Sequence, residues 1–121
     1  MFTLEQVNRE IDLFAKEMNI SVPHLTNIVH EDNHHSYARI SVKDIANGKY
    51  IMYISNDLYQ YDVNYQVSVL WHEFVHIHDI LCFKDNKNIQ YIMATCSEAF
   101  ATTTQLEYLC RSGNPKHILH E

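Results

Sequence analysis

The sequence predicts a single α+β domain over residues 1–121, with an N-terminal helix, a small, mostly antiparallel three-stranded sheet and then two long helices. Three observations predict this order. Apolar residues recur at helical spacing near the N-terminus, strand-like segments follow with a turn signal between two of them, and two long runs without proline or glycine fill the second half. A chain of this length can bury roughly two-thirds of its unfolded surface around one core.

The first helix is expected over residues 4–18. Its apolar residues recur at the spacing that puts them on one helix face: Leu4, Val7, Ile11, Phe14 and Met18. Thr3 is a candidate N-cap, because its hydroxyl can accept a hydrogen bond from a main-chain N–H of the first turn, where Glu5 and Gln6 follow. The proline of Ser21-Val22-Pro23 ends this unit, since proline cannot continue a helix.

Three strand-like segments come next, over residues 24–30, 37–43 and 49–55. Asn47-Gly48 lies between the second and the third, and this dipeptide is the strongest short signal for a β-hairpin. Residues 50–54 are apolar enough to lie against helices. We therefore expect a small sheet with an edge beside the later helices, where an extended peptide can pair with it.

Residues 64–83 contain neither proline nor glycine and are expected to form one long helix. A helical wheel separates its side chains into two groups. One side carries Tyr65, Val69, His72, His76 and Asp79, and the other carries Val67, Leu70, Trp71, Phe74, Ile77 and Leu81. A helix divided in this way packs its apolar side against a core and turns the other side toward a cleft.

His72 and His76 lie four residues apart on this helix, so both imidazoles can bind a single metal ion. Glu73 follows His72 and lies about 100° further around the helix, where it can reach a metal-bound water without being a ligand. Metal-assisted hydrolysis requires this combination, a Lewis acid that lowers the pKa of water and a carboxylate that takes its proton. A catalytic zinc ion also needs a third protein ligand.

Six downstream residues are candidates for that third ligand: His78, Asp79, Cys96, Glu98, His117 and His120. Glu98 is the strongest, because it lies on a second helical run, residues 88–111, that a short polar loop folds back against the first long helix. The side chains of His78 and Cys96 point away from the expected site on their helical wheels. Asp79 fits better as a hydrogen-bond partner for the second ring nitrogen of a ligand, or as a solvated residue at the helix end.

The segment His72-Glu73-Phe74-Val75-His76, with a glutamate on the next helix, resembles the gluzincin branch of zinc metallopeptidases. The stretch Ser97-Glu98-Ala99-Phe100-Ala101 is similar to the Glu-x-Phe-Ala motif around the third ligand of anthrax lethal-factor-type peptidases. It is more loosely similar to the Glu-Ala-x-x-Phe-Ala segment of ImmA/IrrE-like peptidases of bacteria, phages and mobile elements. The resemblance covers about residues 68–106 and implies a minimal zincin-like fold.

The resemblance also implies roles for particular residues. His72, His76 and Glu98 would be the zinc ligands, and Glu73 would be the general base. Tyr91 precedes Glu98 by the spacing of a tyrosine that is proposed to stabilise the oxyanion in lethal-factor-type enzymes. One position departs from the pattern: these families often have a carboxylate four residues after the third ligand, where this chain has Thr102.

Composition and charge narrow the classes of partner. The net charge of −6 without a basic cluster argues against binding to nucleic acid. No apolar run is long enough for a membrane span and no signal-like segment is present, so a cytoplasmic protein is expected. Three cysteines fall on expected helices and are interpreted as reduced core residues: Cys82, Cys96 and Cys110.

The sequence thus predicts an intracellular zinc metallopeptidase of phage or mobile-element type that acts on a protein or peptide. The alternative is a regulatory or protein-interaction module that binds zinc without hydrolysis, although such a module has no need for Glu73. A structural zinc site fits less well, because those sites use four ligands rich in cysteine. His30, His34 and His35 are expected in a solvated loop with Glu31 and Asp32, where a second metal site is the alternative.

Overall fold

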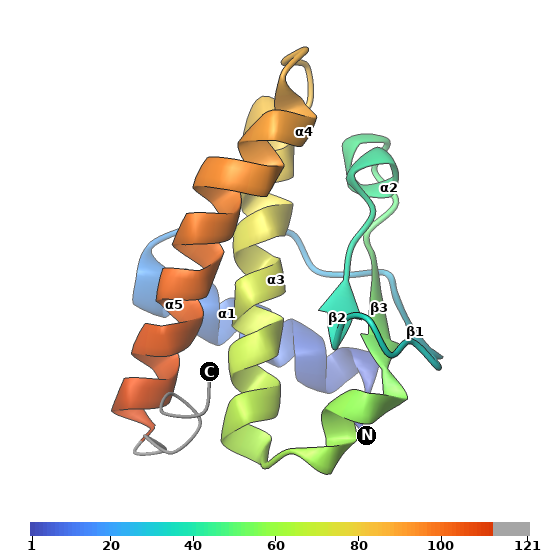
Figure 1. Ribbon diagram of the computed structural model, residues 1–121, viewed down its shortest axis with the longest axis vertical. Coiled ribbons are helices and arrows are strands. Elements are labelled where there is room, and N and C mark those ends of the chain that lie inside the picture. The colour runs from blue at the N-terminus through green and yellow to red at the C-terminus, as the bar shows by residue number, and fades with distance from the viewer. Residues whose placement is uncertain (113–121) are drawn as a thin grey trace.

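The computed structural model describes residues 1–112 and confirms the α+β class and the order of helix, sheet and long helices (Figure 1). Helix α3 lies at the centre, with α5 along one side, α1 crossing behind it and the sheet on the other side. The elements are α1 (Leu4–Met18), β1 (Asn27–Glu31), β2 (Ala38–Arg39), α2 (Val42–Ala46), β3 (Ile51–Ser55), the 3-10 helix η1 (Asn56–Gln60), α3 (Val63–Phe83), α4 (Ile89–Ile92), the π-helical turn η2 (Met93–Ser97) and α5 (Glu98–Arg111).

Helix α1 has the bounds that the sequence predicts. The Thr3 hydroxyl accepts a hydrogen bond from the Gln6 N–H, and the Gln6 side chain accepts one from the Thr3 N–H, which completes a capping box. Phe14 is fully buried and meets Trp71 and Phe74 of α3 edge-on, with ring centroids 5.3 and 5.6 Å apart. These contacts fix α1 across the back of α3.

The sheet is mixed, and the expectation of a mostly antiparallel sheet is wrong for its longer pair of strands. The strand order is β1-β3-β2, and β1 pairs with β3 in parallel over all five residues. Only Ala38 and Arg39 of β2 pair antiparallel with β3. A parallel pair needs a crossover of about a dozen residues or more, and residues 32–50 supply it. Strand β2 is therefore an edge strand on the side that faces α3 (Figure 1).

The predicted hairpin at Asn47-Gly48 is wrong, because a short helix, α2, occupies part of the expected second strand. The Ser41 hydroxyl accepts a hydrogen bond from the Asp44 N–H and begins this helix. Gly48 has a φ of +79° and follows the helix end, where its N–H donates to the Ile45 carbonyl over 3.1 Å. The dipeptide therefore ends a helix, a position at which glycine is favoured because it adopts positive φ without strain.

Helix α3 begins one residue before the predicted start and ends at the predicted residue. Leu70, Phe74, Ile77 and Ile80 are fully buried on it, and Met52 and Ile54 of β3 are fully buried as well. Each such side chain stabilises the fold by about 1.5–3 kcal/mol through burial. Within residues 1–112 no helix has both the length and the apolar character that crossing a membrane requires.

The second predicted helix, over residues 88–111, is present but interrupted. Four residues of α-helix (α4) are followed by the π-helical turn η2, and α5 then begins at Glu98. Ala101 of α5 is fully buried, and its small side chain allows α5 to pack closely against α3. Because of this interruption, the residues that lie on the same helix face as Glu98 are not those that a regular α-helix would place there.

Candidate metal centre

The structure brings His72, His76 and Glu98 together between α3 and α5. Glu98 lies between the two imidazoles, with Oε1 at 3.1 Å from Nε2 of His72 and Oε2 at 2.9 Å from Nε2 of His76. One ligand atom from each of the three residues falls within 4.8 Å of the others, so the group could hold a metal ion. Among the described residues no other group of His, Cys, Asp and Glu converges in this way.

The second ring nitrogen of each histidine has a partner on the neighbouring helical segment. Nδ1 of His72 lies 3.0 Å from Oε1 of Gln105, and Nδ1 of His76 lies 2.8 Å from the hydroxyl of Ser97. The Gln105 amide is oriented by its own Nε2, which donates to Ser68 over 3.4 Å. Partners of this kind fix the ring orientation and the tautomer of metal-binding histidines.

The tautomer of His72 has a direct consequence for the cluster. A carbonyl oxygen only accepts, so Nδ1 of His72 must donate its proton to Gln105. In a neutral imidazole Nε2 then carries a lone pair, and that lone pair faces the Glu98 carboxylate. Two electron-rich atoms at 3.1 Å repel each other unless a positive charge lies between them. The contact therefore requires either a proton between the two atoms, on the ring or on the carboxyl group, or a bound metal ion.

For His76, the direction of the pKa shift favours the neutral ring. Burial lowers the pKa of His76, the nearby His72 lowers it further, and Glu98 opposes both effects. The neutral imidazole is the form that binds metals. A donor set of two imidazoles and one carboxylate, with ring orientations fixed by Gln105 and Ser97, could hold a metal ion.

Glu73 lies beside the cluster without joining it. Its carboxylate Oε2 is 4.0 Å from Nε2 of His72, and the residue is 8% exposed. Burial raises the pKa of Glu73 to about 8, and the negative charge of Glu98 adds to the rise. A buried carboxyl group with a pKa near the operating pH can both accept and return a proton, which is the requirement for a general base.

The π-helical turn η2 places two of these residues. It ends at Ser97, which is 2% exposed beneath His76, and Glu98 follows directly as the first residue of α5. π-helical turns inside helices are frequent at functional sites. The sequence prediction missed Ser97 and Gln105. Gln105 follows Glu98 by two helical turns, and this spacing is the one signal that identifies it in advance.

Two hollows flank Glu73, which lines both of them. The first, of about 310 Å³, lies toward the end of α3 and is lined by Arg39, Ile40, Val42, Glu73, His76, Ile80, Gln90, Met93, Ala94 and Glu98. The second, of about 220 Å³, lies toward the start of α3 and is lined by Ser36, Tyr37, Ala38, Tyr65, Val69, His72, Glu73 and Gln105. Residues 36–42, which include β2, therefore border both hollows.

The structure does not bring Tyr91 to the cluster. Its side chain is 72% exposed on α4, and it borders neither hollow. The wider turn of η2 lies between Tyr91 and Glu98, so two residues that would share a face of a regular α-helix no longer do so. The oxyanion role of Tyr91 stays a prediction.

The other candidate ligands lie elsewhere. Nδ1 of His78 is 3.0 Å from the Asp79 carboxylate, so Asp79 bonds to His78 and not to a cluster histidine. Cys96 is exposed, as are Cys82 and Cys110, so the interpretation of the three cysteines as core residues is wrong. His117 and His120 lie outside the described residues. At the departure from the family pattern, the Thr102 hydroxyl donates to Oε1 of Glu98 over 3.5 Å.

Comparison with known proteins adds no relative. No protein-family model matches the chain, and neither a curated protein nor a solved structure matches it. A proposal for the function therefore rests on the side chains of the cluster and their surroundings.

Proposed function

We propose that the protein is a zinc-dependent metallopeptidase that hydrolyses peptide bonds inside the cell. One observation carries the proposal: two imidazoles and a carboxylate converge, while the buried carboxyl group of Glu73 lies 4.0 Å from one of the ligand atoms. A structural zinc site has four protein ligands and no need of a base, whereas a catalytic site has three ligands and an open position.

Zinc is the metal that this donor set fits best. Two histidines and one glutamate form the ligand set of a known class of zinc peptidases, and four-coordinate zinc leaves one position for water. The sequence resemblance to gluzincins supports the same assignment for His72, His76 and Glu98. A zinc ion bound here would act as a Lewis acid that lowers the pKa of a water molecule and polarises a peptide carbonyl.

Each residue around a bound zinc ion would then have a defined role. The Glu73 carboxylate accepts the proton of the attacking water and returns it to the leaving amine, a role that contributes about 10²–10⁴-fold to the rate. Gln105 and Ser97 hold the two imidazoles in place through their Nδ1 atoms. A dication near Glu73 favours its ionised form, so the carboxylate is available as a base at neutral pH.

The edge strand β2 offers a way to hold the substrate. The Tyr37 carbonyl accepts a hydrogen bond from Ser55 of β3, so the alternation of an antiparallel strand turns the main-chain groups of Ala38 toward the free edge. An extended peptide added at that edge would pass between β2 and α3 in front of Glu73. The hollow of about 310 Å³ includes Ile40, Val42 and Ile80 and suits an apolar side chain.

The resemblance to ImmA/IrrE-like peptidases supports a phage or mobile-element setting, which remains part of the proposal. A zinc-binding regulatory module without hydrolysis is the rival. The experiment that separates the two is a cleavage assay on a peptide library, with cleaved bonds identified by mass spectrometry. We expect the zinc-loaded protein to cleave a subset of peptides, and we expect chelation or the change Glu73→Gln to abolish cleavage. Equal cleavage by Glu73→Gln would refute the mechanism, and zinc binding without any cleavage would favour the module.

A further inference from the structure

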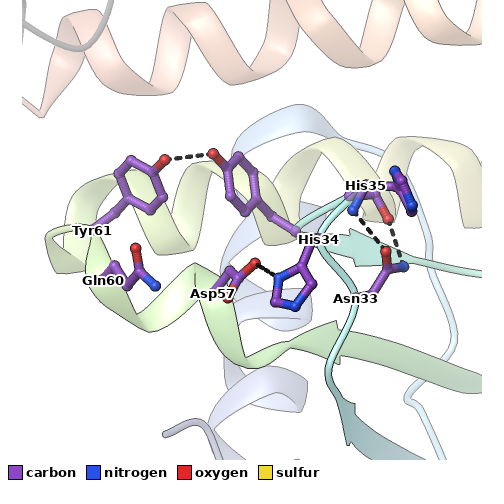
Figure 2. Close-up of a pocket in the computed structure, with 8 residues that line it drawn as sticks. Asn33, His34, His35, Asp57, Gln60 and Tyr61 are labelled. Atoms are coloured by element: carbon purple, nitrogen blue, oxygen red, sulfur yellow. Dashed lines mark hydrogen bonds and ion pairs between the residues drawn. The ribbon is translucent and has the colours of Figure 1, made fainter.

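A larger hollow, of about 490 Å³, opens between η1 and the loop that joins β1 to β2 (Figure 2). On the loop side it is lined by Asn33, His34 and Tyr37, and on the other side by Asp57, Gln60 and Tyr61. Figure 2 shows the Asp57 carboxylate and the Gln60 amide on the wall formed by η1, with His34 facing Asp57. A hollow of this size accommodates a long amino-acid side chain.

Hydrogen bonds between its two walls hold the hollow open before any ligand binds. The Ser55 hydroxyl donates to the Asn33 carbonyl over 2.6 Å, and the Asn56 amide donates to Asp32 over 2.6 Å. A third contact, between Nδ1 of His34 and Oδ2 of Asp57 over 2.6 Å, must open when a ligand pairs with that oxygen. A preformed site loses less conformational entropy on binding than a site that must be ordered by its ligand.

The hollow adjoins one of the two hollows at the metal centre. Ser36 and Tyr37 line this hollow and also the 220 Å³ hollow that contains His72 and Glu73. A peptide that follows residues 36–42 past Glu73 therefore has one end beside this third hollow. This third hollow could therefore serve as a subsite for a substrate residue that lies some distance from the bond to be cleaved.

The charges around the hollow favour a cation. Its lining residues include the carboxylate of Asp57 and the two histidines His34 and His35, and neither lysine nor arginine. Asp32 lies close enough to act on the same imidazole, since Asp57 first and Asp32 after it raise the pKa of His34. Within residues 1–112 the structure gives Asp57 Oδ2 a side-chain partner, His34, and gives Oδ1 none. The Asp57 side chain is 29% exposed, so a ligand can reach it.

Aromatic rings complete the wall. Tyr37 and Tyr61 meet edge-on with ring centroids 5.1 Å apart, and their hydroxyls are hydrogen bonded to each other. Rings beside a carboxylate favour a guanidinium group, which stacks on an aromatic face while it pairs with the carboxylate. Because His34 is 75% exposed on its side chain, it can give up Asp57 to such a group without leaving a buried donor unpaired.

From this geometry we propose that the hollow is a substrate subsite that binds a basic side chain, with arginine preferred. The inference rests on the proposed peptidase function for its role in substrate selection. Asp57 binds the guanidinium, and the rings of Tyr37 and Tyr61 flank it. In the preferred substrate, the arginine and the bond to be cleaved would lie at opposite ends of the 220 Å³ hollow.

The test compares two peptides that differ only in charge. Acetylated hexapeptide amides with one arginine, or with the neutral analogue citrulline, are titrated into the zinc-loaded Glu73→Gln full chain so that no cleavage interferes. NMR signals of the His34 ring report binding at the hollow. His24, which pairs with Asp12 over 2.7 Å on another surface, provides the reference signal. The same titrations are repeated with Asp57→Asn and with the matched control Asp12→Asn.

We expect the arginine peptide to bind about fivefold more tightly than the citrulline peptide, the range of a partly exposed ion pair. Asp57→Asn should remove this difference, and Asp12→Asn should keep it. Equal binding of the two peptides, an unchanged preference in Asp57→Asn, or no shift of the His34 signals would overturn the subsite. Cleavage of library peptides without a preference for arginine would leave the peptidase proposal intact and remove the subsite. An arginine preference in binding without any cleavage would support the subsite and contradict the peptidase proposal.

Discussion

Removal of zinc should lower the stability of the fold, and the loss should depend on Glu98. Glu98 is the one residue that α5 contributes to the cluster, so a bound ion would join α5 to the two histidines of α3. A ligand that binds only the folded state stabilises it by about 2.7 kcal/mol when its free concentration is one hundred times its dissociation constant. For a domain of this size each kcal/mol shifts the melting temperature by roughly 3–5 °C. Zinc should therefore raise the melting temperature by about 8–13 °C.

The assay is thermal unfolding followed by circular dichroism, with and without zinc, on three proteins. The parent should show the full shift, and Glu98→Ala should show little or none. Glu107→Ala is the matched control, because Glu107 is an exposed glutamate on the same helix. The same zinc-dependent shift in Glu98→Ala as in the parent would refute the claim that Glu98 binds the ion. The metal-free parent should stay folded at room temperature, since the apolar core between α1 and α3 does not involve the site.

Three further predictions follow from the surroundings of the site. Gln105→Leu or Ser97→Ala should weaken zinc binding by about 10–100-fold, whereas Asp79→Ala should leave it unchanged, as measured by competition with a zinc-sensitive dye. In the metal-free protein the raised pKa of Glu73 means that the native state binds a proton that the unfolded state has lost between about pH 4.5 and 8. Stability should fall as pH rises through that window, and Glu73→Gln should flatten the fall in a series of urea titrations. Phe14→Ala should destabilise the fold by about 3–5 kcal/mol in the same titrations, without changing the zinc content of the folded protein.

Features of the fold that depend on local sequence could be predicted. The Thr3 capping box and the apolar spacing after it define α1, and the absence of proline and glycine from residues 64–83 defines α3. Both signals act within a few residues of each other, so a single sequence contains them in full. The pairing of β1 with β3 is different, because it joins segments more than twenty residues apart and no local pattern distinguishes a parallel from an antiparallel partner.

Asn47-Gly48 shows how a local signal can be misread. The dipeptide supplies a residue with positive φ, and such a residue can close a hairpin or follow the end of a helix. The choice depends on the Ser41 cap, which begins α2 six residues earlier. If the turn dipeptide is considered without the Ser41 cap, it predicts a hairpin where the structure has the end of a helix.

The residues of the site that belong to a sequence motif could be predicted. The residues that reach the site only through packing between helices could not. The spacing of His72 and His76 and the glutamate on the next helix identify residues that the structure brings together, although the Glu98 side chain is half exposed. Ser97 and Gln105 are ordinary polar residues whose contacts arise only when α5 packs on α3. The π-helical turn that rotates Tyr91 away has no sequence signal of its own, since nothing in residues 93–97 excludes a regular α-helix.

The most direct test of the central claim is anomalous diffraction at the zinc absorption edge from a crystal of the full chain grown with zinc. A single strong peak is expected about 2.0–2.2 Å from Nε2 of His72, Nε2 of His76 and a carboxylate oxygen of Glu98. A water molecule should occupy the fourth position, within hydrogen-bond distance of Glu73. A peak at Cys96 or at His117 and His120, or a fourth protein ligand that fills the position beside Glu73, would contradict the assignment of this cluster as a catalytic zinc site.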